Sequence, residues 1–281
     1  MGADGYREQS RERWERAAAG WAERQETIRA AGLPVSRRLV ELVAPQPGQR
    51  ILEVAAGLGD TGLMLAEAVR PGGTVIVTDG APAMLDAARV AAHRAGADDV
   101  EIRQMEADWL DVDAASLDAI VSRFGYMLVV DPEAAFRDAR RALRPGGRLA
   151  IAVGDAIEAN PWIAVLQAAL VDRGLAEHPT VGRPGMFGLA SADLLRELLG
   201  AAGFFEITVE PVETAWQAPS LDAWWEHVRA TSISLDDALD RLGDAGADEL
   251  RAVVDRGYAG FVAPDGAVRL PARALVASAE A

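Results

Sequence analysis

The stretch that decides the fold is ILEVAAGLGDTG, at residues 51–62. Its first residues are apolar apart from Glu53, as expected of a buried strand. Three glycines follow closely, and they allow a tight turn that a ligand can approach without meeting a Cβ atom. A helix is expected directly after the turn. This strand–turn–helix unit is typical of nucleotide-binding sheets, although a tight turn without a ligand would also explain the glycines.

Strands and helices alternate regularly downstream of this unit. Short, continuous apolar runs predict strands, and Pro or Gly residues end the helices between them. This alternation predicts an α/β protein with a doubly wound parallel sheet, whose strands are apolar throughout because both faces are covered. The elements predicted in order are strand 51–55, helix 61–69, strand 75–78, helix 81–94, strands 100–105 and 117–122, helix 132–143 and strand 148–153.

The charged N-terminal segment, residues 1–44, is expected to form a helical lid. Apolar side chains, Trp14 and Trp21 among them, recur in it at close to helical spacing. The sequence Gly-Leu-Pro at 32–34 predicts the end of the first helix, and a second helix is expected over 36–43.

The rest of the chain, 45–281, is expected to be one domain with insertions. The alternation loosens after residue 154, and helical segments at about 155–190 and 216–262 are interpreted as insertions that build a cap on the sheet. Strands at 205–212 and about 268–277 would complete the sheet.

Composition narrows the classes of function. The chain carries 43 acidic and 28 basic residues, a net charge of −15, and this charge would repel a nucleic-acid backbone or an anionic membrane surface. No apolar run approaches the length of a membrane span, and the N-terminus has no apolar core of a signal peptide. The absence of cysteine excludes disulfides and thiolate chemistry in this chain. We expect a cytoplasmic protein without nucleic-acid or membrane partners, and the sequence leaves a homo-oligomer open.

Carboxylates follow three successive predicted strands. Glu53 lies inside the glycine motif, Asp79 ends the second strand, and Asp108 follows the third with Trp109 beside it. In one crevice, Asp79 could accept both ribose hydroxyls, while Asp108 and Trp109 could hold a purine. Helix capping by Asp79 and a plain surface turn at Asp108 are the alternative explanations. A carboxylate at Glu53 would repel a pyrophosphate and attract an ammonium, which favours S-adenosylmethionine over a dinucleotide.

Several motifs in the same order resemble those of class I S-adenosylmethionine-dependent methyltransferases. LEVAAGLGD at 52–60 resembles their first motif, TDGAPAML at 78–85 their second, and LRPGGRL at 143–149 the turn before their fifth strand. SRFGYM at 122–127 is similar to the loop after strand four in the ubiquinone/menaquinone-biosynthesis-like branch, methyltransferase type 11. The resemblance covers residues 45–153 well and is loose elsewhere, so it does not identify the methyl acceptor.

This resemblance implies a Rossmann-like, seven-stranded sheet with a reversed final hairpin, and S-adenosylmethionine as the methyl donor. Ala55 stands where many members have glycine, which leaves the turn less conformational freedom. Packing of an amphipathic helix is an alternative role for Trp14 and Trp21. The implied positions are Ala55 and Gly57 near the methionine part, Asp79 at the ribose, Gly80 and Met84 beside the adenine, Asp108 and Trp109 at its far edge, Arg123 near the methionine carboxylate, and Trp21 with Trp14 over the donor.

The acceptor is expected to bind under the two insertions. Phe124 and Tyr126 should face it from the end of strand four, and His178 and His227 from the insertions. Such histidines are more often packing or surface residues than bases, so no catalytic residue is assigned. Arg123 stands at the strand end instead of an aspartate, and no metal is predicted. The tryptophan-rich insertions favour an aromatic or hydrophobic acceptor.

Two other functions stay open. An NAD-dependent oxidoreductase would use the same glycine turn, but Glu53 disfavours it, and a catalytic Tyr–Lys pair is impossible because the chain contains no lysine. A non-catalytic S-adenosylmethionine-binding protein would have the same donor pocket, so the sequence does not separate it from an enzyme.

Overall fold

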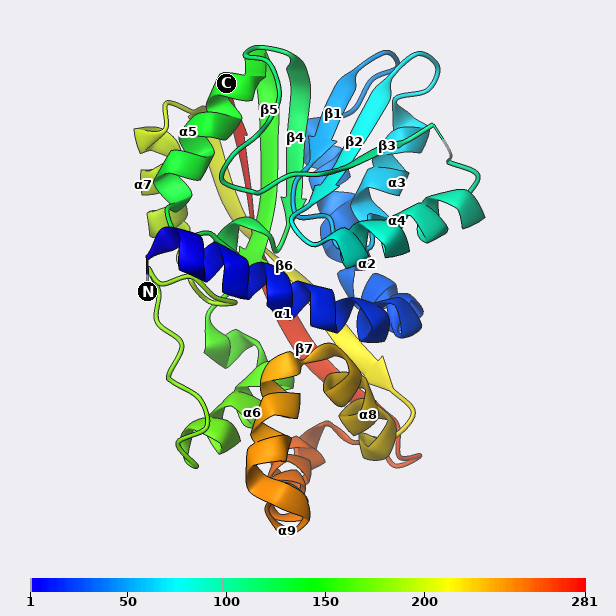
Figure 1. The fold of residues 1–281 in the computed structure, drawn as a ribbon, viewed down its shortest axis with the longest axis vertical. Helices are drawn as coiled ribbons and strands as arrows, with labels where there is room; N and C mark the ends of the chain where they lie inside the picture. Colours follow the sequence, from blue (N-terminus) through cyan, green and yellow to red (C-terminus); the bar gives the residue numbers. More distant parts are fainter. Residues whose placement is uncertain (1, 98) are drawn as a thin grey trace.

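The computed structural model describes residues 2–97 and 99–281. A seven-stranded sheet with the order β3-β2-β1-β4-β5-β7-β6 forms its centre (Figure 1). Neighbouring strands from β3 to β5 are parallel, whereas β7 is antiparallel to both β5 and β6. The predicted α/β class and the reversed final hairpin are therefore confirmed. The strands are β1 Arg50–Glu53, β2 Thr74–Asp79, β3 Glu101–Gln104, β4 Leu117–Arg123, β5 Leu143–Gly154, β6 Phe205–Ala218 and β7 Val268–Glu280.

Helices cover both faces of this sheet because its strands are apolar on both sides. On one face, Leu39 of α2, Leu65 of α3 and Ala88 of α4 join a buried cluster with β1 and β2. On the other face, Phe136 of α5 and Leu199 of α7 join a second cluster. The helices of these layers are α2 Gln25–Val43, α3 Asp60–Ala68, α4 Pro82–Arg94, α5 Pro132–Ala142 and α7 Ala192–Ala201.

The N-terminal helices differ from the prediction. The break comes at Arg24, between α1 (Ala3–Glu23) and α2, and α2 continues through Pro34. A proline inside a helix costs about 3 kcal/mol because it removes one backbone hydrogen bond. Val35 and Leu39, which follow it, are fully buried against the sheet, and this packing offsets the cost. The glycine and proline at 32–34 therefore do not end the helix.

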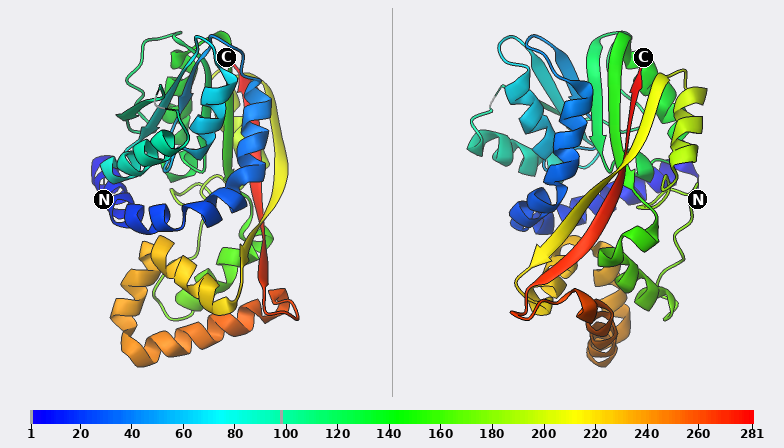
Figure 2. Two further views of the ribbon diagram at one scale, coloured as in Figure 1. Left: turned by 90° about the vertical axis from the view of Figure 1, so that its right-hand side faces the viewer. Right: turned by 180° about the vertical axis from the view of Figure 1, so that it is seen from behind.

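Helices from both predicted insertions pack together beyond the sheet. We call α6 (Pro161–Val171), α8 (Leu221–Thr231) and α9 (Ile233–Tyr258) the helical cap. Their buried side chains form one cluster with the far ends of β6 and β7, which run on past the parallel strands to reach it (Figure 2). The predicted start of the second insertion at 216 is wrong, because Trp216 belongs to β6 and pairs with Leu270 of β7. Helix α1 crosses between the sheet and the helical cap (Figure 1).

Candidate functional site

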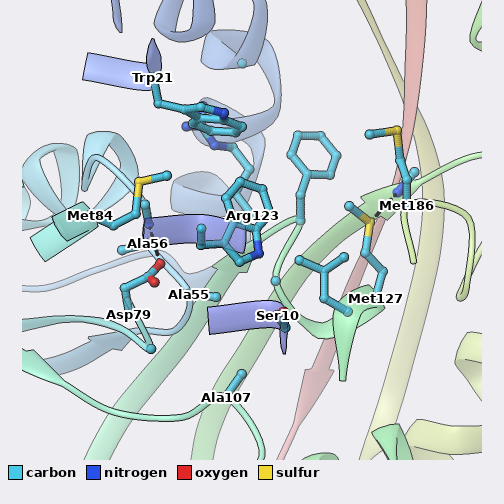
Figure 3. A pocket seen from close by; sticks show the side chains of 18 of the residues that line it. Ser10, Trp21, Ala55, Ala56, Asp79, Met84, Ala107, Arg123, Met127 and Met186 are labelled. Carbon is cyan, nitrogen blue, oxygen red and sulfur yellow. Dashed lines mark hydrogen bonds between the residues drawn. The ribbon is translucent and has the colours of Figure 1, made fainter. Parts of the chain in front are cut away.

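A cavity of about 290 Å³ opens at the carboxyl ends of β1, β2 and β4. The strand order reverses between β1 and β4, and open α/β sheets bind ligands at such a point. We call the part lined from segments 55–60, 79–84 and 106–108 with Arg123 the turn half. The part lined from segment 124–130, except Tyr126, together with Trp162, Met186 and Trp216 is called the cap half. Figure 3 shows the side chains of both halves around one space.

Asp79 ends β2 and lies in the turn half (Figure 3). One carboxylate oxygen accepts a hydrogen bond from the backbone N–H of Gly57, and the other from that of Ala81, both at 2.9 Å. Burial raises the pKa of Asp79, although these N–H groups act in the opposite direction. The carboxylate therefore ties the glycine turn to the loop after β2. Gly80 and Met84 line the same wall of the cavity.

The glycine turn contains an alanine in a conformation that favours glycine. Ala55 has φ of +51°, and Gly57 and Gly59 have φ of +56° and +78°. The methyl group of Ala55 occupies space that Gly125 leaves free, since a Cβ atom on Gly125 would lie only 2.5 Å from it. Ala55 and Gly57 both line the cavity. The departure from glycine at position 55 is thus accommodated by a glycine on the neighbouring strand end.

Glu53 differs from its predicted role. Its side chain is buried behind the turn, where Oε2 accepts a hydrogen bond from the backbone N–H of Gly62 at 2.8 Å, and it does not line the cavity. Burial raises the pKa of Glu53 to about 8, against the opposing effect of Arg123. At neutral pH most of this carboxyl is protonated, so it supplies little charge to attract an ammonium. Its observed contact is with the first turn of α3.

Arg123 and Asp60 form an ion pair in the wall of the turn half. Arg123 ends β4, and its Nη2 lies 3.2 Å from Oδ2 of Asp60, the first residue of α3. The two side chains are 11% and 5% exposed, and both residues line the cavity. Helix α2 crosses this pair at Gly32, where a Cβ atom would lie only 2.0 Å from Nη1 of Arg123. A glycine at this position therefore leaves room for the guanidinium under α2.

Helix α1 roofs the turn half through ion pairs. Arg7 donates from Nε to Asp108 at 2.9 Å, and Arg11 from Nη1 to Glu106 at 3.4 Å. Asp108 lines the cavity, but its neighbour Trp109 does not and is 76% exposed. The turn bridged between Glu106 and Trp109 directs Asp108 inward and Trp109 outward, so the structure does not bring Trp109 into the site.

Trp21, near the end of α1, lines the cavity and connects it to the helical cap. Its ring meets that of Trp14 edge to face, with centroids 5.2 Å apart, and its Nε1 donates to the backbone oxygen of Thr231 on α8 at 3.1 Å. Trp21 thus borders the turn half and also packs, with Trp14, against a hydrophobic cluster, as an amphipathic helix would require.

The cap half is mainly apolar. Phe124 lines it with φ of +67°, a strained conformation that is common at functional sites. Trp162 of α6 and Trp216 of β6 lie against each other with ring centroids 5.2 Å apart and form its aromatic wall. Met127 and Met186 enter from other segments (Figure 3). Such a surface can hold a planar or apolar molecule and exclude water from it.

Three predicted residues of the cap half lie elsewhere. His227 is buried behind Trp216, stacked on Trp224 at 5.2 Å, and burial lowers its pKa to about 4, so it stays neutral. His178 is exposed on the loop after α6. Neither lines the cavity. Tyr126 is buried among the side chains of the α5 face, with its ring 5.1 Å from that of Phe136. It begins a short 3₁₀ helix, Tyr126–Leu128, in which successive side chains point in different directions around the axis, so Tyr126 enters the core while Met127 lines the cavity.

Tyr126 therefore leads to a prediction about stability. Among the described residues its hydroxyl has no hydrogen-bond partner, and burial raises the pKa of that hydroxyl. A buried polar group without a partner costs about 1–3 kcal/mol. We expect Tyr126→Phe to leave the free energy of unfolding unchanged or to raise it by about 1 kcal/mol, as measured by urea unfolding. A loss of more than 1 kcal/mol would show that the hydroxyl is satisfied in solution.

The structure also assembles residues that the sequence analysis missed. Asp60, Gly32, Trp162 and Trp216 belong to segments far apart in the sequence, and the contacts between them depend on how α2 and the helical cap dock. Asp60 carried the strongest signal, because it follows the last glycine of the turn and begins α3. Trp162 and Trp216 lie in the tryptophan-rich segments expected to cover the acceptor, but nothing in the sequence singled them out, and Gly32 carried no signal of a site residue.

The described residues lack two features, a cluster of metal ligands and a membrane-spanning helix. Within 2–97 and 99–281, no group of three or more His, Asp or Glu side chains is arranged to hold a metal ion. In the same part of the chain, no helix combines the length and apolar character needed to span a membrane.

Comparison with protein families and sequences identifies relatives. The model of the ubiE/COQ5 methyltransferase family matches residues 35–165. Nocamycin O-methyltransferase from Saccharothrix syringae is 32% identical over 208 residues, which are 68% of this chain and 71% of that protein. Demethylmenaquinone methyltransferase from Thermus thermophilus is 40% identical over 123 residues, 43% of this chain and 54% of that enzyme. The chain thus matches about half the length of the second relative.

Solved structures share the fold. The YcgJ protein from Bacillus subtilis superposes with a TM-score of 0.56 at 18% identity, covering 87% of this chain and 97% of that one. The phosphoethanolamine N-methyltransferase 2 of Haemonchus contortus, solved with S-adenosyl-L-methionine, gives a TM-score of 0.52 at 18% identity, covering 87% and 52%. At this identity the likeness concerns the fold alone.

Proposed function

This chain belongs to the ubiE/COQ5 family of S-adenosylmethionine-dependent methyltransferases, and we propose that it transfers the methyl group to a small aromatic or hydrophobic molecule by in-line displacement. One observation carries the proposal. The turn half, with its strand-end carboxylate, and the apolar cap half are parts of the same cavity. A donor in one half would therefore present its methyl group to an acceptor in the other.

The turn half fits the groups of the donor. Asp79 would accept hydrogen bonds from the ribose hydroxyls, and Gly80 and Met84 would border the adenine. Asp108 would lie at the adenine's far edge, next to its present partner Arg7. Ala55 and Gly57 would pass beside the methionine part, whose carboxylate would meet Arg123. Of the expected lid, residues 1–44, helix α1 would cover the donor, with Trp21 above it, whereas α2 packs on the sheet.

The cap half fits an apolar acceptor. Phe124 and Met127 would face it from the end of β4, and the Trp162–Trp216 wall would stack on a planar ring. When bound, the donor supplies a methyl group that is already activated by the positive charge on sulfur. The protein itself would orient the acceptor for in-line attack and exclude water from it, and the mainly apolar wall of the cap half favours both.

Two observations favour this function over the alternatives. The model of a methyltransferase family matches residues 35–165, which contain the glycine turn that an NAD-dependent oxidoreductase would also use. The relatives are named for small acceptors, nocamycin and demethylmenaquinone. A non-catalytic donor-binding protein would share the turn half, but it would have no need of a second, apolar chamber open to it.

Calorimetry with S-adenosylmethionine, S-adenosylhomocysteine and NAD tests the donor. We expect the first two to bind and NAD not to bind, because the carboxylates of Asp60 and Asp79 line the cavity beside the glycine turn and would repel a pyrophosphate. A panel of small phenols and quinols, with bulk tRNA as the contrasting acceptor, tests the acceptor class. Turnover of tRNA at a rate equal to that of the phenols, or donor binding without any turnover, would count against the proposal.

A further inference from the structure

Helix α1 lines the cavity with two neighbouring stripes of polar side chains. Arg7 and Arg11, one turn apart, form the arginine stripe and pair with carboxylates of segment 106–108 in the turn half. Tyr6 and Ser10, also one turn apart, form the hydroxyl stripe, and both line the cavity. The ion pairs that roof the turn half account for the arginine stripe and leave the hydroxyl stripe unexplained.

The hydroxyl stripe faces the space between the sheet and the helical cap. Successive residues of an α-helix lie about 100° apart around its axis. Tyr6 and Ser10 therefore fall between the arginine stripe, which contacts the turn half, and Arg16, which pairs with Asp237 of α9 at 2.7 Å. Figure 3 shows Ser10 and Met127 beside the same space. The hydroxyl stripe is thus directed past the turn half and toward the cap half.

The two hydroxyl groups of this stripe lack a partner within the described protein. Across residues 2–97 and 99–281, neither the Tyr6 nor the Ser10 hydroxyl forms a hydrogen bond, and both residues are partly buried. Burial raises the pKa of Tyr6, against the opposing effect of Arg13, so its hydroxyl stays protonated at neutral pH and can donate. Because partly buried polar groups that face a cavity can be satisfied by what enters it, these hydroxyls can bind a ligand.

Three other polar side chains line the cavity near the cap half, and each already has partners. Thr214 donates its hydroxyl to a backbone oxygen of α2. The amide nitrogen of Asn160 donates to three backbone oxygens, and its amide oxygen accepts from Nε1 of Trp162. The guanidinium of Arg273 pairs with two carboxylates. The hydroxyl stripe therefore offers an acceptor hydrogen bonds that the protein does not use itself.

We propose that Tyr6 and Ser10 bind an oxygen atom of the acceptor, so that the site selects a hydroxylated aromatic molecule such as a phenol or a quinol. This inference rests on the proposed function, because it concerns the acceptor of the same reaction. The ring of the acceptor would lie on the Trp162–Trp216 wall, and its oxygen would point toward α1. Helix α1 would then cover the donor through the arginine stripe and recognise the acceptor through the hydroxyl stripe.

Two probes that differ by one hydroxyl group test this inference. 1-Naphthol and naphthalene are titrated by calorimetry into the protein saturated with S-adenosylhomocysteine, which occupies the turn half and leaves the cap half open. We expect 1-naphthol to bind roughly two- to tenfold more tightly than naphthalene, the net effect of one hydrogen bond. Equal affinities of the two probes for the unmodified protein would overturn the inference.

Removal of both hydroxyl groups should abolish this preference. In the double variant Tyr6→Phe, Ser10→Ala, the affinity for 1-naphthol should fall to that for naphthalene or below it, because the naphthol hydroxyl would then be buried without a partner. Naphthalene and S-adenosylhomocysteine should keep their affinities, since neither would contact the removed hydroxyls. Gln9→Ala is the matched control, because Gln9 is exposed on α1 and does not line the cavity, and it should change none of the three affinities.

The remaining outcomes separate this inference from the proposed function. A preference for 1-naphthol that survives in the double variant, or an equal loss of affinity for both probes, would overturn the role of the hydroxyl stripe. If the double variant no longer binds S-adenosylhomocysteine, Tyr6→Phe and Ser10→Ala are tested singly, and at least one must weaken 1-naphthol more than naphthalene. Failure of the unmodified protein to bind S-adenosylhomocysteine, or to bind either probe, would instead remove the proposed function itself.

Discussion

Replacement of Asp79 by alanine is expected to weaken the binding of S-adenosylhomocysteine by about 1–3 kcal/mol, or roughly five- to 150-fold. The loss has two sources. The ribose hydroxyls would lose their acceptor, and the backbone N–H groups of Gly57 and Ala81 would lose the oxygens to which they now donate at 2.9 Å. The glycine turn would then be held less firmly beside the ligand.

Calorimetry measures this effect, and a second carboxylate provides the control. Asp86→Ala removes an exposed acid on α4 whose partner is Arg89, so it should leave the affinity unchanged. Because Asp79 would touch the nucleoside, Asp79→Ala should weaken methylthioadenosine as well as S-adenosylhomocysteine. An affinity for both ligands equal to that of the unmodified protein would remove Asp79 from the donor site.

Gly32→Ala is expected to reduce the affinity for S-adenosylhomocysteine by about tenfold or more while changing the free energy of unfolding by less than about 1 kcal/mol. The new Cβ atom would lie 2.0 Å from Nη1 of Arg123, so the guanidinium must move. It is the end of a flexible side chain and can shift at little cost to the fold. Its shift would take it away from the carboxylate of the ligand.

A glycine in another helix provides the matched control for Gly32→Ala. Gly200 in α7 has room for a methyl group, since the nearest atom to its Cβ position belongs to Ile207 at 3.9 Å. Gly200→Ala should therefore keep both stability and affinity. Methylthioadenosine, which has no carboxylate, should bind the Gly32→Ala variant normally. If its affinity falls in parallel with that of S-adenosylhomocysteine, Gly32 shapes the whole cavity and not the place of Arg123.

Local patterns were sufficient to predict most of the sheet. The signals for the strands and helices are local: apolar runs such as the one in β2, and proline and glycine residues after the helices. The alternation of strands and helices could therefore be predicted from the sequence. The extent of β6 could not be predicted in this way, because its residues up to Ala218 are held in the sheet by pairing with β7. The predicted helix end at residues 32–34 was wrong for a similar reason, since burial of Val35 and Leu39 outweighs the local tendency of glycine and proline to end a helix.

Side-chain direction was the weaker part of the prediction for the site. Tyr126 lies in a segment that borders the cavity but points into a core, and Trp109 points to solvent. His227 also points into a core, and no described residue of its helix, α8, lines the cavity. A sequence shows that a residue is near a strand end. It does not show on which side of a turn or wall the side chain emerges, because that depends on a single backbone dihedral angle and on the neighbours that fill the core.

The amino-acid sequence by itself determined the strand–turn–helix unit, the carboxylate at the end of β2 and the family, because each of these is encoded in a short contiguous stretch. Tertiary structure alone decided that Asp60 and not Glu53 faces the cavity, and that Gly32 lies on Arg123. Contacts of this kind join segments that are remote along the chain, and they exist only after α2 has packed on the sheet and buried its apolar side.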